Sequence, residues 1–207
     1  MEFLYEKIQE LGLGDTYLHV ITTNKAFNLP YHNTPHLENV CKYALMGAEH
    51  YGLSIEDQII IATAALYHDK DHTGSGKNDD INIEIAINDF LAHNTNNNQR
   101  FIDAVVNCIK ATRYPYLYEV VDIREKIIRD ADVLQNLFIP NFITNVVGGI
   151  STEANIPFKT LLDGQENFYQ NVIKFNTDWA VELFNEQLPN VMNKVNAVRS
   201  FYNLQAA

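Results

Sequence analysis

The stretch Ile59-Ile60-Ile61-Ala62-Thr63-Ala64-Ala65-Leu66-Tyr67-His68-Asp69 joins a largely apolar segment directly to a histidine and an aspartate. The apolar part is consistent with a buried helix. Adjacent residues on a helix project about 100° apart, so His68 and Asp69 reach a common point only near a helix end or across a concave wall. Burying such a pair costs free energy unless a metal ion or another partner satisfies it. The stretch therefore predicts a metal site or a polar partner where a core helix ends.

Two further segments carry the same kinds of ligand. Tyr31-His32-Asn33-Thr34-Pro35-His36 places His36 close to a predicted helix start, because proline is favoured in the first helical turn. Asp130-Ala131-Asp132 sets two acids at i and i+2 of an amphipathic helix, where they point to different faces. We expect Asp132 to face inward, with Asp130 as a supporting acceptor or as the partner of a cation.

Together the three segments offer nitrogen and oxygen ligands from His36, His68, Asp69 and Asp132. Two neutral imidazoles and two carboxylates hold a divalent cation and leave positions for water and a phosphate oxygen. No cysteine lies in the three segments, which argues against a closed structural zinc site. Mixed sets of this kind accept Mn, Mg, Co, Ni, Zn or Fe, so the sequence predicts one divalent metal ion, or two, without specifying the element.

Helical periodicity dominates the chain, and no segment alternates over the length of a strand. We predict an all-α, single-domain helical bundle over residues 1–207, with the motifs in a core of residues 30–137 and C-terminal helices of residues 150–207 packed on it. All prolines, including Pro189, fall at predicted helix boundaries. The predicted helices span residues 2–12, 15–27, 36–52, 55–69, 81–93, 98–112, 119–138, 139–149, 156–186 and 188–204.

The composition narrows the range of partners. A net charge of −11 over 207 residues argues against a nucleic-acid polymer, because phosphate backbones require a basic surface. A small anionic ligand stays compatible, since a metal ion and a few local cations can outweigh the global charge. The apolar runs are too short to span a membrane, and Cys41 and Cys108 lack metal-binding spacing. We predict a cytoplasmic protein with reduced thiols and no membrane partner, and a homo-oligomer stays compatible with the sequence.

The order His…His-Asp…Asp resembles the signature of the HD-superfamily metal-dependent phosphohydrolases. Small bacterial HD proteins have similar length and similar Ile-x-Ala-Thr and Asp-x-Asp segments, here at residues 109–112 and 130–132. The chain differs from the class I cyclic-nucleotide phosphodiesterases at Lys70 and Thr73, and we identify no counterpart of their purine-binding Gln-Phe pair near the C-terminus. The blocks similar to those phosphodiesterases are Tyr31-His32-Asn33-x-x-His36, His68-Asp69-x-Asp71-His72-x-Gly74 and Asn82-x-Glu84-x-Ala86.

This resemblance implies an all-α HD fold and hydrolysis of a phosphate ester by metal-activated water. It makes His32 the proton donor to the leaving oxygen, which suits an imidazole that titrates near neutral pH. Asp69 could bridge a second cation, and His72 and Glu84 would orient ligands or water. The cations near these motifs in sequence are expected to bind substrate phosphate: Lys70, Lys77 and Arg113.

Three functions are compatible with the sequence. The leading one is a phosphohydrolase acting on a nucleotide or another small phosphorylated metabolite. Its substrate would be a monoester, or a cyclic diester as in a cyclic-nucleotide phosphodiesterase. Some HD proteins instead carry two irons and oxidise substrates with O₂, and His72 is available as an extra ligand for that chemistry. The third function is a catalytically silent module that binds a nucleotide.

Overall fold

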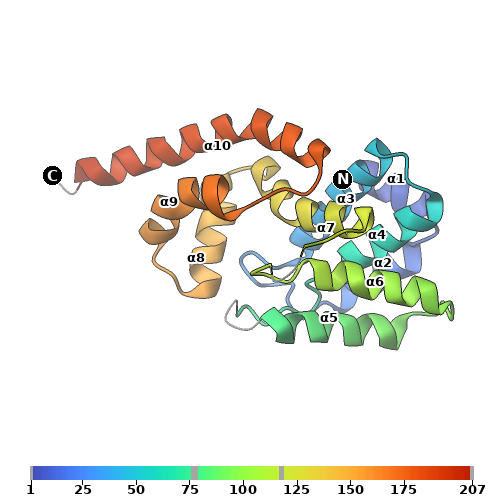
Figure 1. The fold of residues 1–207 in the computed structure, drawn as a ribbon. Helices are drawn as coiled ribbons and strands as arrows, with labels where there is room; N and C mark the ends of the chain where they lie inside the picture. Colours follow the sequence, from blue (N-terminus) through green and yellow to red (C-terminus); the bar gives the residue numbers. More distant parts are fainter. Residues whose placement is uncertain (1, 76–78, 117–118, 206–207) are drawn as a thin grey trace.

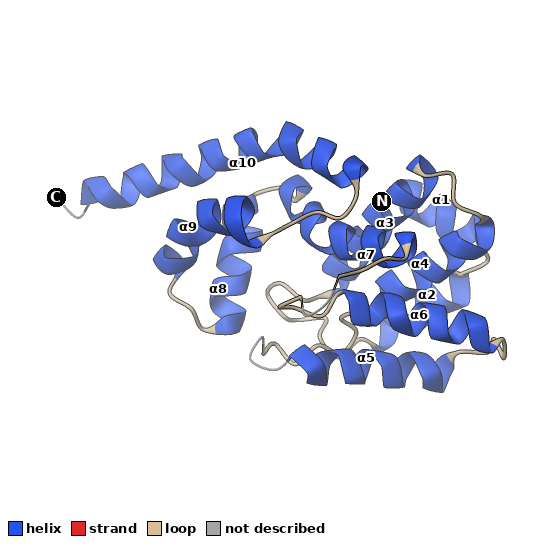
Figure 2. Cartoon of the chain, viewed as in Figure 1, coloured by secondary structure: helices blue, strands red, loops and turns tan. Residues whose placement is uncertain are grey.

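Helices are the only regular elements among the described residues, which contain no strand (Figure 2). The structure, a computed structural model, describes residues 2–75, 79–116 and 119–205. The all-α fold predicted from the sequence is confirmed. In chain order the elements are α1 (Glu2–Glu10), α2 (Gly14–Thr23), α3 (Thr34–His50), α4 (Ile55–Tyr67), α5 (Asp79–His93), α6 (Gln99–Ala111), α7 (Ile123–Leu134), the 3₁₀-helix η1 (Gln135–Phe138), the π-helix η2 (Ile143–Gly148), α8 (Gly149–Ala154), α9 (Phe158–Asn167), the π-helix η3 (Phe168–Val172) and α10 (Asp178–Gln205).

Capping side chains fix where the two central helices begin. Asn33 accepts a hydrogen bond from the backbone N–H of His36 at 3.2 Å, and Pro35 lies in the first turn of α3. Ser54 accepts from the backbone N–H of Asp57 at 3.1 Å at the start of α4. These caps satisfy amide groups that have no partner inside the helix, and they set the position of His36 relative to α4.

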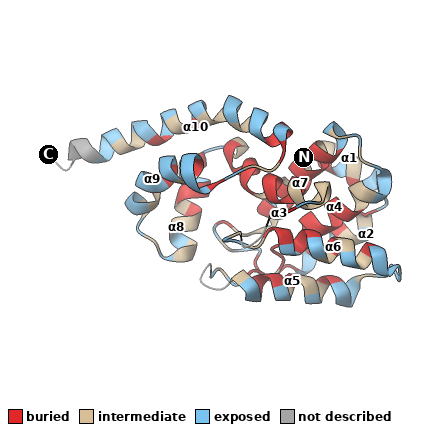
Figure 3. Cartoon of the chain, viewed as in Figure 1, coloured by how far each residue is buried: buried red, intermediate tan, exposed pale blue. Residues whose placement is uncertain are grey.

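Helix α4 is the centre of the core (Figure 3). From Ile60 to Tyr67 none of its residues is more than 4% exposed, and α3, α6 and α7 pack around it. Gly47 of α3 permits an especially close approach, because an added Cβ would lie 3.0 Å from side-chain atoms of Ile127 in α7 and Trp179 in α10. The packing brings the start of α3, the end of α4 and the last turn of α7 to one region of the molecule.

The C-terminal elements form a second group of helices beside this core (Figure 1). Helix α10 contacts α7, α9 and η1, and its far end extends past α9. The sequence predicts one helix over residues 156–186 and a boundary at Pro189, and both predictions are wrong. The chain leaves its helical path after Val172, and Pro189 lies inside α10. Pro189 cannot bond to the carbonyl of Asn185, but both residues are exposed, so water can satisfy that carbonyl.

Membrane-spanning character is weak in this fold. Among the described residues no single helix is both long and apolar enough to cross a membrane. The pair Ile123–Phe138 and Ile143–Ala154 reaches the required length and composition only jointly, across a bend of 118°. The expected absence of a membrane partner stays a prediction.

A buried carboxylate joins the two groups of helices. Asp130 of α7 is 1% exposed and accepts hydrogen bonds from the backbone N–H groups of Asn176 and Thr177, at 2.9 and 2.8 Å. It also accepts from the Asn176 side-chain amide and the Thr177 hydroxyl, both at 2.7 Å. Asp130 therefore supports the chain at the start of α10, and these partners are neutral donors rather than a cation.

Replacing Asp130 by alanine is expected to lower the free energy of unfolding by about 3 kcal/mol, because buried donors lose their charged acceptor. Urea unfolding followed by circular dichroism measures this change. Asp163→Ala, which removes the ion pairs of an exposed aspartate with Lys159 and Arg199, is the matched control and should have a far smaller effect. Equal stability of the Asp130 variant and the wild type would contradict the role assigned to this carboxylate.

Candidate metal centre

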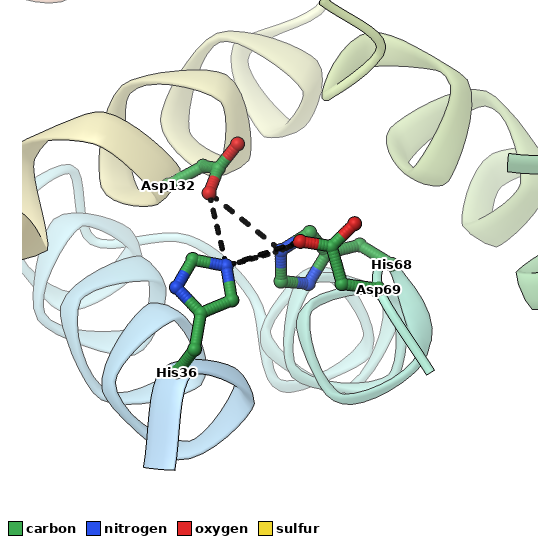
Figure 4. Close-up of side chains that lie close together, drawn as sticks. All are labelled: His36, His68, Asp69 and Asp132. Carbon is green, nitrogen blue, oxygen red and sulfur yellow. Dashed lines mark hydrogen bonds and ion pairs between the residues drawn. The ribbon is translucent and has the colours of Figure 1, made fainter. Parts of the chain in front are cut away.

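Three helical segments bring four potential metal ligands to one point (Figure 4). His36 lies in the first turn of α3, His68 is the residue that ends α4, and Asp69 follows it. Asp132 comes from the last turn of α7. The cap that starts α3 and the buried course of α4 therefore determine how the ligands are spaced.

The four side chains present their ligand atoms to one another at short range. His36 Nε2 lies 3.2 Å from His68 Nε2, 3.1 Å from Asp69 Oδ2 and 3.3 Å from Asp132 Oδ1. His68 Nε2 lies 3.3 Å from Asp69 Oδ2 and 3.6 Å from Asp132 Oδ1. Adjacent ligands of a cation with bonds of about 2.1 Å stand about 3 Å apart, so these atoms fit one divalent ion. The side chains of Asp69 and Asp132 keep 12% and 21% of their surface exposed, which leaves one side of the set accessible.

The backbone fixes the tautomer of one imidazole. His68 donates its Nδ1–H to the carbonyl oxygen of Ala65 at 2.8 Å. Because a carbonyl can only accept, the proton of a neutral His68 resides on Nδ1, and Nε2 presents its lone pair to the other ligands. The local fold at the end of α4 therefore prepares His68 for metal binding.

Electrostatics within the set favours charged groups despite burial. Burial alone would lower the pKa of His68, but the charges of Asp69 and Asp132 and hydrogen bonds to them raise this pKa well above its ordinary value. Burial would raise the pKa of Asp132, but hydrogen bonds from His36 and His68 lower it to about 2. The pKa of Asp69 is also held well below its ordinary value by the histidines. The carboxylates of the set are therefore held ionised beside His68, and a divalent cation would compete with the proton of that imidazole.

A histidine–glutamate pair stands beside the four ligands. His32 Nδ1 forms a very short hydrogen bond with Glu153 of α8, whose other oxygen accepts from the backbone N–H groups of Tyr31 and His32, both at 3.1 Å. His32 Nε2 lies 3.9 Å from Asp69 Oδ2, on the side of the metal set. Burial alone would lower the pKa of His32, but Glu153 and the nearby charge of Asp69 raise it. The sequence indicates no role for Glu153, because no motif surrounds it and only the fold brings α8 to the start of α3.

His72 packs directly behind His32. The two rings stack with centroids 3.9 Å apart, and burial lowers the pKa of His72 to about 4, so this imidazole is neutral at neutral pH. Its Nδ1 accepts from the N–H of Gly74 at 3.0 Å, and its Nε2 faces the Asn82 amide at 2.8 Å. His72 therefore supports the ring of His32 from behind, and its expected role in orienting metal ligands or water stays a prediction. His32, His72 and Glu153 also offer ligand atoms within 4.8 Å of one another, a second set that could hold a cation.

The structure revises the expected phosphate-binding cations. Lys70 is 1% exposed, and its Nζ lies 3.0 Å from Asp89 of α5, so the prediction that it binds substrate is wrong. The sequence places Lys70 next to Asp69, but consecutive side chains at a helix end diverge, and this one turns away from the ligand set. Arg113 pairs with Asp80, with Nη2 at 3.0 Å from Oδ2. Lys77 lies outside the described residues.

Glu84 is also expected to orient ligands or water at the site. It lies on the exposed face of α5 and forms no hydrogen bond or ion pair with any described residue. Asn82, two residues earlier, faces the opposite way and contacts His72 instead. Along a helix, residues two apart point to different sides, so the segment can direct only one of these side chains toward the site. The structure thus gives Glu84 no contact with the described residues of the site, and its catalytic role stays a prediction.

A cavity of about 450 Å³ opens beside the metal set. His32 and Asp132 line it at the metal end, and the opposite walls come largely from residues 146–173 of the C-terminal group. Gln165 and Phe168, one helical turn apart, belong to this lining, although the sequence alone does not single them out. The described lining residues include neither lysine nor arginine, so the cavity suits a neutral and largely apolar group.

Solved structures share this fold at low sequence identity. A crystal structure of a Lactobacillus plantarum protein, a structural genomics target, has 17% identity and a TM-score of 0.64, and the match covers 92% of this chain and 98% of that one. A structure of LmjPDEB1 in complex with IBMX has 16% identity and a TM-score of 0.56, with 98% of this chain and 85% of that chain covered. A comparison with curated proteins gives no significant match.

The family comparison agrees with the positions of the ligands. Residues 35–137 match the HD domain family, and this segment contains His36, His68, Asp69 and Asp132. Domains of this family bind divalent metal ions, and the donor set described above fits such an ion. Through residues 35–137, the chain belongs to the HD domain family.

Proposed function

We propose that the protein is a metal-dependent phosphohydrolase that cleaves a phosphate ester of a nucleotide or a similar small metabolite. The observation that carries this proposal is the junction of a four-ligand metal set with a cavity large enough for a small organic group. Asp132 belongs to both, and His32, which stands beside the metal set, also lines the cavity, so a phosphate at the metal set leaves the rest of its substrate in the cavity.

The ligand set and the histidine pair have separate tasks in this reaction. A divalent cation bound by the four ligands would supply an activated water and polarise the phosphoryl group. His32 directs Nε2 toward the same place and, with Nδ1 held by Glu153, can give its proton to the leaving oxygen. Glu153 orients the ring and stabilises its protonated form.

The cavity supports a nucleotide as substrate. Gln165 donates its amide to the carbonyl of Leu161 at 3.1 Å, so its own carbonyl oxygen is left to accept from an N–H group of a bound base. Phe168 adds an aromatic surface to the same wall. A monoester is the leading form of substrate, and a cyclic diester is the alternative within the same chemistry.

The proposal is tested by a substrate panel. Purified protein would be incubated with nucleoside monophosphates, cyclic nucleotides and p-nitrophenyl phosphate, each with Mn, Mg, Co, Ni, Zn or anaerobic Fe(II). Released phosphate and opened cyclic esters would be followed by a colorimetric assay and by chromatography. We expect hydrolysis that requires a divalent cation. Oxygen consumption by an iron-loaded protein without hydrolysis would contradict the proposal and favour the oxygenase alternative, and inactivity with every cation would contradict both.

A further inference from the structure

The two imidazoles of the metal set are supported from behind in different ways. His68 Nδ1 faces a backbone carbonyl, which can only accept. His36 Nδ1 instead faces the side-chain amide of Gln135, at 3.2 Å from the atom assigned as Nε2. An amide has a donor end and an acceptor end of nearly the same shape, so this partner can serve either tautomer of His36.

The surroundings of Gln135 are closed to water. The residue is 0% exposed and is the first of η1, directly after the helix that carries Asp132. Its Nε2 end also lies 2.7 Å from Asn136 Oδ1, 3.4 Å from the backbone carbonyl of Asp132 and 3.5 Å from the hydroxyl of Tyr31. Its Oε1 is buried and has no hydrogen-bond partner among the described residues. One end of the amide lacks a partner in either orientation, so the groups at the other end decide which orientation is stable.

The position of the proton on the His36 ring decides which way the Gln135 amide is turned. When His36 Nε2 binds a cation, it must give up its hydrogen, and the neutral ring then carries its proton on Nδ1. That N–H requires an acceptor, which Gln135 supplies if its amide is turned so that Oε1 faces the ring. Asn136 can turn in the same way, and the Tyr31 hydroxyl can donate or accept, so these two hydrogen bonds survive the change, whereas the 3.4 Å bond from Nε2 to the backbone carbonyl of Asp132 is lost.

We propose that Gln135 is a positioning residue for His36, which donates to Nδ1 in the ion-free protein and accepts from Nδ1–H when a divalent cation is bound. This inference rests on the metal set of the proposed function. Under this inference, the affinity for the cation depends partly on Gln135, a residue that does not contact the cation. Partners of this kind typically change metal affinity by about 10-fold to 100-fold when they are removed.

The test compares Mn²⁺ affinity, by titration calorimetry or by the signal of free Mn²⁺, in three proteins. Gln135→Leu keeps a similar volume without an acceptor, and we expect it to bind Mn²⁺ about 10-fold to 100-fold more weakly than the wild type. Gln135→Glu can only accept, and we expect it to bind at least as tightly as the wild type. Thr63→Val, which removes another buried side-chain polar atom that has no partner among the described residues, is the control and should leave the affinity unchanged.

A second readout separates positioning from general damage to the fold. In the Zn²⁺-loaded wild type, ¹⁵N-correlated NMR of the imidazoles should show the His36 proton on Nδ1. Equal Mn²⁺ affinity in Gln135→Leu and the wild type would overturn this inference and leave the proposed function standing. Weak Mn²⁺ binding by both Gln135→Leu and Gln135→Glu would also overturn this inference and leave the proposed function standing. If the wild type binds no divalent cation, the proposed function and the inference fail together.

Discussion

Asp69→Ala is expected to reduce metal-dependent hydrolysis by at least about a thousandfold. Asp69 lies within 3.1 Å of His36 and 3.3 Å of His68, and its loss leaves the set one carboxylate short. A bound cation contributes several kcal/mol to stabilising the charge that develops on the phosphoryl group, and each 1.36 kcal/mol corresponds to about a factor of ten in rate. The removal of one anionic ligand therefore affects both the affinity for the cation and the turnover.

The measurement is the rate of phosphate release at saturating Mn²⁺ or Co²⁺, together with the Kd of the cation. Asp103→Ala, an exposed aspartate on α6, is the matched control and should keep the wild-type rate. Circular dichroism checks that the variant retains its helices. Full activity of Asp69→Ala with intact fold would show that the four-ligand set does not perform the reaction.

His32→Gln is expected to slow hydrolysis by about a hundredfold to ten-thousandfold for substrates with poor leaving groups. The ring of His32 is held between Glu153 and His72, with Nε2 directed toward the metal set. An alkoxide leaving group needs a proton as the ester bond breaks, whereas p-nitrophenolate leaves readily without one. The loss should therefore be much smaller for p-nitrophenyl phosphate than for a nucleotide.

Glu153→Gln gives a graded version of the same experiment. It keeps a hydrogen-bonding group beside His32 but removes the negative charge that stabilises the protonated ring, so we expect a smaller loss with the same dependence on leaving group. His50→Gln, at the opposite and exposed end of α3, is the control for the histidine substitution. Equal losses in His32→Gln for good and poor leaving groups would contradict proton donation.

Patterns that are local in sequence predicted much of the site. The apolar course of α4 requires that the chain bury His68, and Pro35 with the Asn33 cap fixes His36 at a helix start. Those features determine where ligands lie relative to a helix, and the fold class follows from periodicity. The apolar neighbours on α7 also indicated that Asp132 faces inward, but this helix is buried around most of its surface, and Asp130 is buried as well.

Contacts between distant segments could not be predicted in this way. Glu153 reaches His32 across 121 residues, and no spacing rule connects them. Lys70 looked available because it follows the ligands in sequence, but its partner Asp89 lies on another helix. Pro189 looked like a boundary because proline lacks an N–H, and only its exposure explains why the helix continues.

The cavity walls have a consequence for how such a protein changes over time. Groups that would perform the proposed chemistry come mainly from residues 31–136, whereas the walls that would recognise the substrate come largely from residues 146–173. Substitutions in the later segment can alter which molecule enters while the reaction itself is preserved. Selection can therefore adjust preference and reactivity largely independently, although Glu153, which lies in one segment and serves the other, restricts that freedom.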